Sequence, residues 1–447
     1  MYTRDQVKAI TDKLLDMAKT DAEVDFSGSE RSGTRFANST ITTNLVQYDQ
    51  QVTITLYQGQ RAGSASTRDF SDAGLKNAVD EAVKRAASAR EMPNPPVLLG
   101  PQTYLPVDAA VPGGVNFGPL ERARMVKASL DVAETKGVLG AGYIPKIDQA
   151  TCTANNKGLF AYYRAAEASF ILTCRTPDGT GSGWAGTTGI KDPTTIDAAG
   201  LTTIAADKAL RSRKAVALEP GRYTVILEPR ANARFLSLMT GIFNARAAES
   251  GRSFLSKPGG ATKLGEKAFS DLLTLRSDIG NTTLRQTPML SDNKPAAPVT
   301  WVEKGVVKNL IYDEAYARQK NVAPTPANLN MSLVMEGTSQ SVEDMIKSTR
   351  RGLLVTFFWY IRGVDQDTLL NTGMTRDGLF LIENGEITRP VQNFRWNMSP
   401  LVGYNNLTAV GRPVPMHMGE SYDGQGTALI PPVRMEDFYM TSVSPAV

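Results

Sequence analysis

The sequence predicts an α+β fold with an N-terminal antiparallel sheet accompanied by helices, a middle α/β segment and a β-rich C-terminal domain. Segments near the N-terminus alternate apolar and polar residues, as half-buried antiparallel strands do. A cluster of prolines then interrupts the chain before further helical patterns begin. The last half of the chain consists mostly of short apolar runs separated by turns. A chain of 447 residues is long enough for two or three domains.

The N-terminal segment predicts a helix, a set of strands and a second helix. Apolar residues at helical spacing predict a helix over 3–19. Residues 34–45 and 51–57 alternate in the way that neighbouring strands do. The next helix is expected over 71–90, with Ser71 available to cap its first turn. We assign residues 1–92 to an N-terminal α+β domain.

A proline cluster separates this segment from the next one. Seven prolines lie between residues 91 and 119. Proline fixes φ and lacks a backbone donor, so this density prevents a regular helix or a central strand. We therefore assign residues 93–118 to a linker.

The middle segment, residues 119–217, predicts a domain of helices and strands. A helix is expected over 120–136 and another over 195–214. The residues between them form apolar runs typical of strands, with a hairpin turn at Asn155-Asn156-Lys157-Gly158.

The C-terminal domain is expected to span residues 218–447. It begins with a short β-branched run over 223–227, which predicts a buried strand. A helix is predicted over 232–247, and a later strand pair is broken at Asn384-Gly385, a strong hairpin signal. The apolar face of the predicted helix comprises Phe235, Leu238, Met239, Ile242 and Phe243.

The composition excludes several classes of protein. Lys and Arg outnumber Asp and Glu by only 49 to 45, and no basic run is interleaved with aromatic residues, so we expect no nucleic-acid partner. No apolar run approaches the ~20 residues of a membrane span. The N-terminus is charged and amphipathic and does not resemble a signal peptide. We therefore expect a cytoplasmic protein without a membrane partner.

The chain is poor in the side chains that bind metals or act as nucleophiles. It contains one histidine, His417, so a histidine-rich zinc site cannot be built within one chain. Cys152 and Cys174 are too few and too widely spaced for a zinc cluster, and their apolar surroundings predict buried thiols. We therefore expect no metal site and no cofactor in this chain.

Long stretches of the sequence resemble one known family. The first stretch, RFANSTITTNLVQYDQQVTITLYQGQRAGSASTRDF and the helix after it, combines two strands, a glycine-rich turn and an alanine-rich helix. The C-terminal stretches are VEKGVVKNLIYD at 302–313, PANLN at 326–330 and GLFLIENGE at 378–386. In this order they resemble the TldD/PmbA proteins, the "modulator of DNA gyrase" family. The resemblance spans nearly the whole chain and implies the family's three-part fold.

The resemblance also identifies a lost catalytic motif. The catalytic branch of the family carries His-Glu-x-x-x-His on the helix that here begins near Asn232. The matching positions of this chain are Ser237, Leu238 and Ile242. The chain therefore resembles the PmbA, or TldE, branch, which lacks the zinc motif, and we expect it to contain no catalytic residue.

This branch implies a non-catalytic partner subunit of a metallopeptidase that degrades or processes unfolded peptides. The partner would be a TldD-type subunit that carries zinc, and this chain could form a homodimer when alone. Peptides are commonly held by strand addition, so the C-terminal β-rich domain is the place to look. The candidate peptide-binding residues are Asn309, Tyr312, Asn328 and Asn330.

Two other functions remain open from the sequence. The chain could be a homodimer that binds peptides or a small molecule without any TldD-type partner. It could also be a hydrolase without a metal, in which His417 would be the available histidine for general acid/base chemistry.

Overall fold

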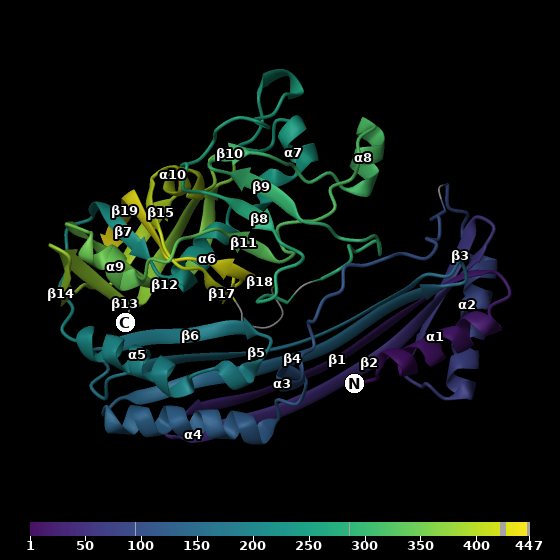
Figure 1. The fold of residues 1–447 in the computed structure, drawn as a ribbon, viewed down its shortest axis with the longest axis horizontal. Coiled ribbons are helices and arrows are strands. Elements are labelled where there is room, and N and C mark those ends of the chain that lie inside the picture. The colour runs from purple at the N-terminus through teal and green to yellow at the C-terminus, as the bar shows by residue number, and fades with distance from the viewer. Residues whose placement is uncertain (94, 286, 421–425, 445–447) are drawn as a thin grey trace.

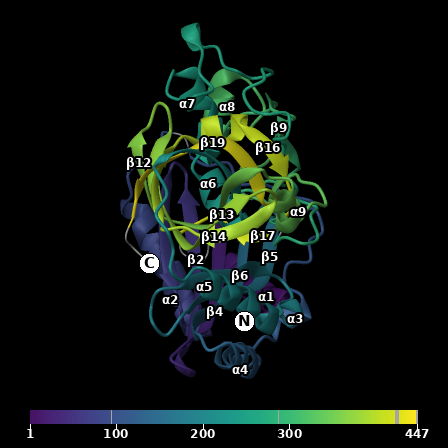
Figure 2. The same ribbon diagram turned by 90° about the vertical axis from the view of Figure 1, so that its left-hand side faces the viewer.

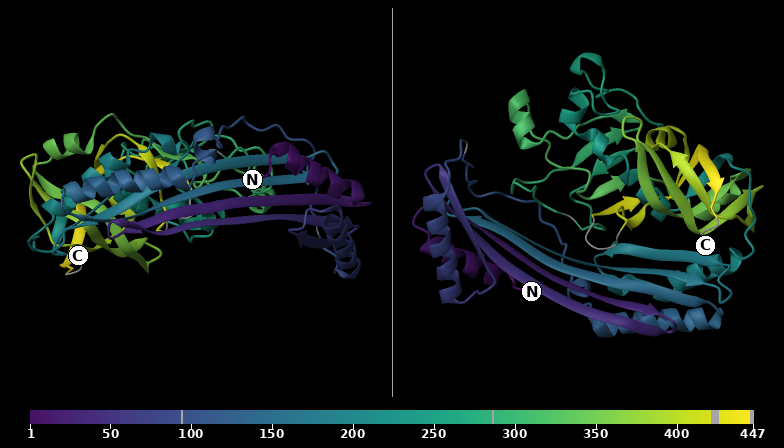
Figure 3. Two further views of the ribbon diagram at one scale, coloured as in Figure 1. Left: turned by 90° about the horizontal axis from the view of Figure 1, so that it is seen from below. Right: turned by 180° about the vertical axis from the view of Figure 1, so that it is seen from behind.

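Six strands form one long antiparallel sheet in this computed structural model, which describes residues 1–93, 95–285, 287–420 and 426–444. The strand order is β3-β2-β1-β4-β5-β6, and every neighbouring pair is antiparallel. The longest strands run through most of the molecule (Figure 3). The strands are β1 (Asp21–Ala37), β2 (Thr40–Gln58), β3 (Arg61–Thr67), β4 (Leu139–Asn155), β5 (Phe160–Arg175) and β6 (Ser182–Ile190).

Turn residues explain where these strands reverse. Asn38 and Ser39 join β1 to β2 with φ of 52° and 59°, the positive values that a two-residue type I′ hairpin requires. The hairpin predicted at residues 155–158 is confirmed, because β4 ends at Asn155 and Gly158 turns with a φ of 95°. Asparagine and glycine tolerate this conformation better than other residues do.

Helices cover both ends of the sheet. The predicted N-terminal helices are α1 (Arg4–Met17) and α2 (Asp72–Ser88), and Ser71 caps α2 by accepting a hydrogen bond from the backbone N–H of Gly74. At the other end lie α4 (Pro119–Thr135) and α5 (Ala198–Arg211), preceded by the short 3-10 helix η1 (Pro193–Thr195) (Figure 1). These four helices agree with the predicted helices to within a few residues.

The strand β1 pairs with β4, so the segments before and after the proline cluster contribute to the same sheet. Arg122 of α4 reinforces this connection, because its buried guanidinium donates hydrogen bonds to Thr34 Oγ1 at 2.9 Å and Ser32 Oγ at 3.2 Å. The proline-rich segment itself contains only the short helix α3 (Pro112–Val115) in its described part. The domain boundaries that we expect at residues 92, 118 and 217 stay a prediction.

The C-terminal region contains a closed β-barrel. The strands pair in the circular order β12-β7-β19-β15-β13 and back to β12, with β7 and β12 parallel. The predicted hairpin at Asn384-Gly385 is confirmed as the connection between β13 and β14. The strands are β7 (Gly221–Leu227), β12 (Arg351–Asp365), β13 (Leu370–Glu383), β14 (Glu386–Pro390), β15 (Phe394–Met398), β16 (Leu407–Val410) and β19 (Val433–Val443).

A second sheet lies beside the barrel, in the order β10-β9-β8-β11-β18-β17. Its strands are β8 (Leu275–Ser277), β9 (Val299–Glu303), β10 (Val306–Val307), β11 (Leu333–Met335), β17 (Val414–His417) and β18 (Thr427–Ile430). The helices of this region are α6 (Pro229–Ser237), η2 (Thr240–Phe243), α7 (Ala245–Glu249), η3 (Pro258–Gly260), α8 (Glu314–Lys320), α9 (Val342–Lys347) and α10 (Pro400–Asn405). The predicted α+β class with a β-rich C-terminal domain is confirmed.

Aromatic side chains fill the barrel. Phe358 of β12 lies 4.8 Å from Trp396 of β15 and 5.7 Å from Phe438 of β19, measured between ring centroids. Since β12 neighbours neither β15 nor β19, these contacts cross the barrel interior. Phe235 of α6 packs against all three rings and is fully buried. The barrel core therefore fixes the helix that follows β7.

The helix predicted over 232–247 is wrong in its extent. The α-helix begins earlier, at Pro229, and ends at Ser237, and the chain continues as η2 and then α7. The predicted apolar residues are still directed inward, apart from Leu238, which is half-buried. Over so few residues, their spacing suits a 3-10 turn as well as an α-helix. The periodicity therefore did not reveal that the α-helix ends at Ser237.

The C-terminal region sits on one face of the long sheet at its β6 end, and α4 covers the opposite face (Figure 2). The strands β13 and β17 both contact β6. Trp184 of β6 packs on Phe357 of β12 with ring centroids 5.6 Å apart, which joins the sheet to the barrel. In the described residues no helix has the length and apolar character needed to cross a membrane.

We expect the Phe235→Ala variant to lose ~3–5 kcal/mol of unfolding free energy, because it removes a ring that contacts three barrel strands and leaves a cavity. Urea unfolding followed by tryptophan fluorescence measures the loss, since Trp396 belongs to the same cluster. Val97→Ala is the matched control, because Val97 is 90% exposed and its truncation should change stability by less than about 0.5 kcal/mol. Equal unfolding midpoints for the two variants would contradict the assigned core.

Candidate functional site

The helix α6 is held between the barrel and the second sheet. The buried strand β7 leads into it, and the backbone N–H of Glu228 continues the pairing with β12 by donating to Val355 O. Pro229 occupies the first turn, where its missing N–H would have no helical partner anyway. The helix then contacts β12 on one side and β17 and β18 on the other, and residues 230–236 are buried.

Ser237, Leu238 and Ile242, the positions expected to match the zinc motif, lie at the end of this helix and just beyond it. Ser237 Oγ donates a hydrogen bond to the carbonyl oxygen of Arg234 at 2.7 Å, so its hydroxyl is bound to its own helix. Leu238 is half-buried and packs against the C-terminal core. Ile242 is 5% exposed and belongs to that core.

These side chains do not fit a zinc ion. Zinc in proteins takes nitrogen, sulfur or carboxylate ligands, and the positions offer two aliphatic groups and one hydroxyl that already has a partner. Elsewhere in the described part of the chain, no three His, Cys, Asp or Glu side chains gather closely enough to hold a metal ion.

Two arginines of α6 hold the end of β17 instead. The guanidinium of Arg230 donates to the carbonyl oxygens of His417 at 2.6 Å and Gly419 at 2.9 Å. Arg234 donates to Met418 O at 3.3 Å and forms an ion pair with Glu420 at 3.5 Å. Both arginines are almost completely buried, so these charge-assisted bonds fix the position of residues 417–420 against the helix.

His417 is buried at the end of β17. Its side chain is 2% exposed, and its Nε2 lies 3.7 Å from Glu167 Oε1 of β5. Neither ring nitrogen has a hydrogen-bond partner among the described residues. Burial, together with the positive charges of Arg230 and Arg285, lowers the pKa of His417 to about 3. An imidazole in this position is neutral at physiological pH and has no open path to a substrate.

The four candidate peptide-binding residues do not share one site. Asn309 and Tyr312 line a cavity of ≈ 700 Å³ beside β9. The hydroxyl of Tyr312 donates a hydrogen bond to Glu249. Asn328 lines a different cavity, of ≈ 360 Å³, together with residues of β4 and β5. Asn330 is exposed and its backbone N–H donates to Asn328 Oδ1. The structure therefore brings Asn309 and Tyr312 together and separates them from the other two.

The two cysteines are buried and unpaired with each other, as the sequence predicts. Cys152 lies on β4 and Cys174 on β5, and burial raises the pKa of each thiol to about 12. A thiol with so high a pKa is a poor nucleophile at neutral pH.

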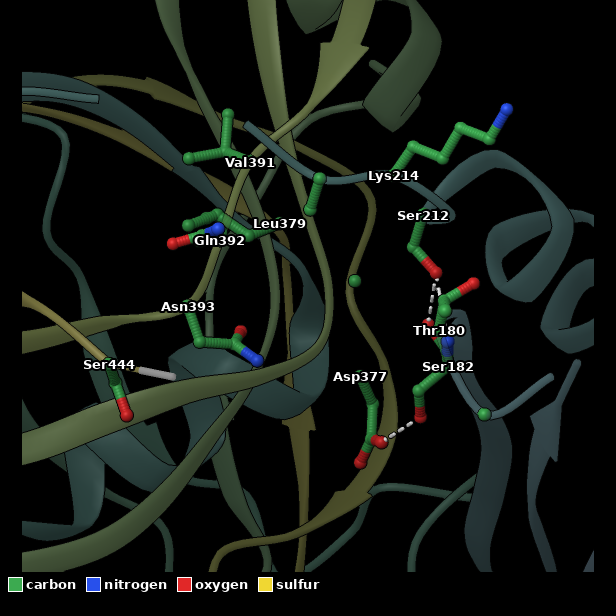
Figure 4. Close-up of a pocket in the computed structure, with 13 residues that line it drawn as sticks. Thr180, Ser182, Ser212, Lys214, Asp377, Leu379, Val391, Gln392, Asn393 and Ser444 are labelled. Atoms are coloured by element: carbon green, nitrogen blue, oxygen red, sulfur yellow. Dashed lines mark hydrogen bonds between the residues drawn. The ribbon is translucent and has the colours of Figure 1, made fainter. Parts of the chain in front are cut away.

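Two further cavities lie where the long sheet meets the barrel. The smaller one, of ≈ 320 Å³, is formed by the β5–β6 turn, the end of α5 and β13 (Figure 4). At its edge Ser182 of β6 donates a hydrogen bond to the buried carboxylate of Asp377 on β13. The larger cavity, of ≈ 610 Å³, lies on the other side of Asp377 and is rich in arginine and aromatic residues.

Neither cavity could be predicted from the sequence, because the lining residues come from strands that are far apart in the chain. Arg35 and Arg376, for example, lie on β1 and β13. The local signal at Arg35, an arginine beside a phenylalanine in an alternating strand, is common on solvated sheets. Only the packing of the barrel on the sheet brings such residues together.

Comparison with known proteins identifies two family domains. The sequence model of the PmbA/TldA metallopeptidase C-terminal domain matches residues 220–442. The model of the PmbA/TldA metallopeptidase domain 1 matches residues 22–86. A search of proteins with curated functions found no match.

Solved structures share the fold over the full length of the chain. A modulator of a DNA gyrase from Thermotoga maritima superimposes with a TM-score of 0.80 at 17% identity, covering 97% of this chain and 99% of that one. TldE from Thermococcus kodakarensis gives 0.79 at 18% identity, with 98% and 100% coverage. A modulator of DNA gyrase from Bacteroides thetaiotaomicron gives 0.75 at 20% identity, with 99% and 100% coverage.

The buried state of His417 predicts how its ring titrates. The folded protein should keep the imidazole neutral down to about pH 3, whereas the unfolded chain binds a proton near pH 6.5. The unfolded state therefore binds more protons between these values, and the histidine's contribution to stability falls as the pH drops below 6.5. Glu167, whose pKa is raised by burial, contributes with the opposite sign. Direct observation of the ring is therefore the cleaner measurement.

NMR provides that observation, because a chain with one histidine gives one set of imidazole signals. We expect no change in the Cε1–H chemical shift between pH 8 and pH 5 in the folded protein, and a midpoint near 6.5 in urea. A midpoint near 6.5 in the folded protein would show that the ring reaches solvent.

Proposed function

Because the chain belongs to the PmbA/TldD metallopeptidase family, we propose that it is the non-catalytic, metal-free subunit of a peptidase complex that cleaves unfolded peptides. The observation that supports the proposal most is the set of contacts made by the side chains of Ser237, Leu238 and Ile242. Each of these side chains serves the helix or the core, and none offers a metal ligand or a free base.

The similarity to TldE over the whole chain supports the TldE-like branch, and with it a TldD-type subunit as partner. In this proposal the partner binds the zinc, which activates water and polarises the scissile carbonyl. This chain has a structural role: Arg230 and Arg234 fix residues 417–420 next to the helix where the catalytic branch has its motif. We expect the complex to form in the cytoplasm.

The free edge of β2 supports the existence of a partner. The strand β3 pairs only with residues 52–58 of β2, so residues 40–51 have no strand partner on that side among the residues that the structure describes. The side chains of residues 40–49 are all exposed, and they include Ile41, Leu45, Val46 and Tyr48. A long apolar edge of this kind is a template for strand pairing with another chain. We assign the TldD-type subunit to this edge.

The cavity that contains Asn309 and Tyr312 is the proposed place for the peptide on this chain. Its volume of ≈ 700 Å³ suits a few peptide side chains, and the exposed Asn309 lies at its wall. Asn328 and Asn330 lie apart from this cavity. In the proposal they are only neighbours of the smaller cavity of ≈ 360 Å³.

Reconstitution tests the proposal. We expect a purified TldD-type protein from the same organism to cleave an unfolded peptide only when this chain is added, and chelation of zinc should abolish the activity. The Ser237→Ala variant should support full activity, because it removes only a hydrogen bond within α6. Cleavage by the partner alone at an unchanged rate, or loss of activity with Ser237→Ala, would contradict the proposal.

A pair of variants tests the edge of β2 in the same assay. Val46→Lys places a charge on this edge and should prevent co-elution of the two chains and peptide cleavage together. Val97→Lys adds the same charge at another exposed position and should leave both unchanged. If this chain elutes as a dimer that binds peptide and never associates with a TldD-type protein, the homodimeric peptide-binding function replaces the proposed one.

A further inference from the structure

The larger cavity between the long sheet and the barrel has the composition of a binding site. Its volume of ≈ 610 Å³ lies within the usual range for small ligands. The sheet contributes residues of β1, β2, β4, β5 and β6, and the barrel contributes residues of β12 and β13. The walls come from strands of two parts of the chain, which are in contact through Trp184 and Phe357.

Aromatic rings and arginines alternate around this cavity. The Arg35 guanidinium lies 4.6 Å from the ring centroid of Tyr143. Arg376 lies 5.4 Å from the ring of Trp359, which itself stacks on Phe357 at 6.4 Å. Stacking on a ring holds the planar guanidinium in place while its N–H groups stay available to a ligand.

The positive charges of the cavity outnumber its negative charges. Among the described residues, three arginines line it, namely Arg35, Arg175 and Arg376, against one carboxylate, that of Asp377. That carboxylate accepts a hydrogen bond from Ser182 and forms an ion pair with Arg376, in which Oδ2 lies 3.8 Å from Nε.

One arginine nitrogen of the cavity also lacks a hydrogen-bond partner. Arg376 Nε is buried and has none within the described residues, although its guanidinium is partly exposed and pairs with Asp377. A bound anion would supply the acceptor that this nitrogen lacks. Within the residues that the structure describes, the side chains of Arg35 and Arg175 form no ion pair.

From this arrangement we propose that the cavity binds an aromatic carboxylate. The carboxylate would be held by the arginines, which match its two oxygens with paired N–H donors. The ring of the ligand would stack among Tyr143, Phe357 and Trp359. The same chemistry is offered by a free aromatic acid and by the C-terminal Phe, Tyr or Trp of a peptide.

Binding to the chain alone tests this proposal. The probes are N-acetyl-phenylalanine, its C-terminal amide, and a short peptide that ends in Phe with a free carboxylate. Tryptophan fluorescence should report binding, because Trp184 and Trp359 line the cavity. We expect both acids to bind and the amide to bind about tenfold or more weakly, since it loses the charge-assisted bonds. The tighter of the two acids identifies the source of the ligand.

Two variants on β1 test whether the ligand binds in this cavity. Arg35→Gln removes a lining guanidinium, and we expect a Kd about tenfold or more higher for N-acetyl-phenylalanine. Arg31→Gln removes an exposed arginine of β1 that does not line the cavity, so its Kd should stay within about twofold of the parent value. Both residues are exposed, and loss of folding is not expected for either.

Three results would overturn the proposal: equal affinity for acid and amide, equal effects of the two variants, or no binding up to about 10 mM ligand. Because no second subunit is present in these measurements, their outcome is separate from the proposed role in a peptidase complex.

Discussion

The pairing of β1 with β4 is the constraint on which the rest of the structure depends. It joins the chain before the proline-rich segment to the chain after it, and it makes a single platform of six strands. Helices cover one face of that platform at the β6 end, so the other face is left for the C-terminal region. Two cavities lie between the long sheet and the barrel, and Glu167 and His417 form a buried pair. These features exist only because the barrel and the second sheet rest on that face.

The helix α6 is held in place by both apolar and polar side-chain contacts. Phe235 anchors it in the barrel, and this anchor is independent of any metal. Leu238 and Ile242, two of the positions expected to match the motif, make apolar contacts that stabilise the core through burial. Arg230 and Arg234 of the helix make polar contacts, and both are directed toward backbone carbonyls of residues 417–419.

Local chemistry made much of the fold predictable. Ser71 capped its helix as expected, and the hairpins at Gly158 and Asn384-Gly385 formed where positive φ was needed. Contacts between distant segments could not be predicted in this way. The periodicity around Ile242 did not reveal that the α-helix ends at Ser237, because a 3-10 turn keeps the same side chains buried.

The candidate sites were harder to predict than the fold. Asn309 and Asn328 are close in sequence, yet they line different cavities, because the chain between them turns through α8. The arginine and aromatic residues of the larger cavity are brought together when the barrel packs on the long sheet. No single segment of the sequence contains enough of them to predict the site. Ser237, Leu238 and Ile242 differ from these residues, because their residue types alone argue against zinc ligation; that they match the motif stays a prediction.

Zinc content tests the central claim most directly. Native mass spectrometry of this chain, of a TldD-type partner and of their mixture counts the zinc ions bound to each species. We predict no zinc on this chain alone, and a mixed dimer with the same zinc content as the partner alone. Stoichiometric zinc on this chain, or additional zinc that appears only when the two chains combine, would contradict this prediction.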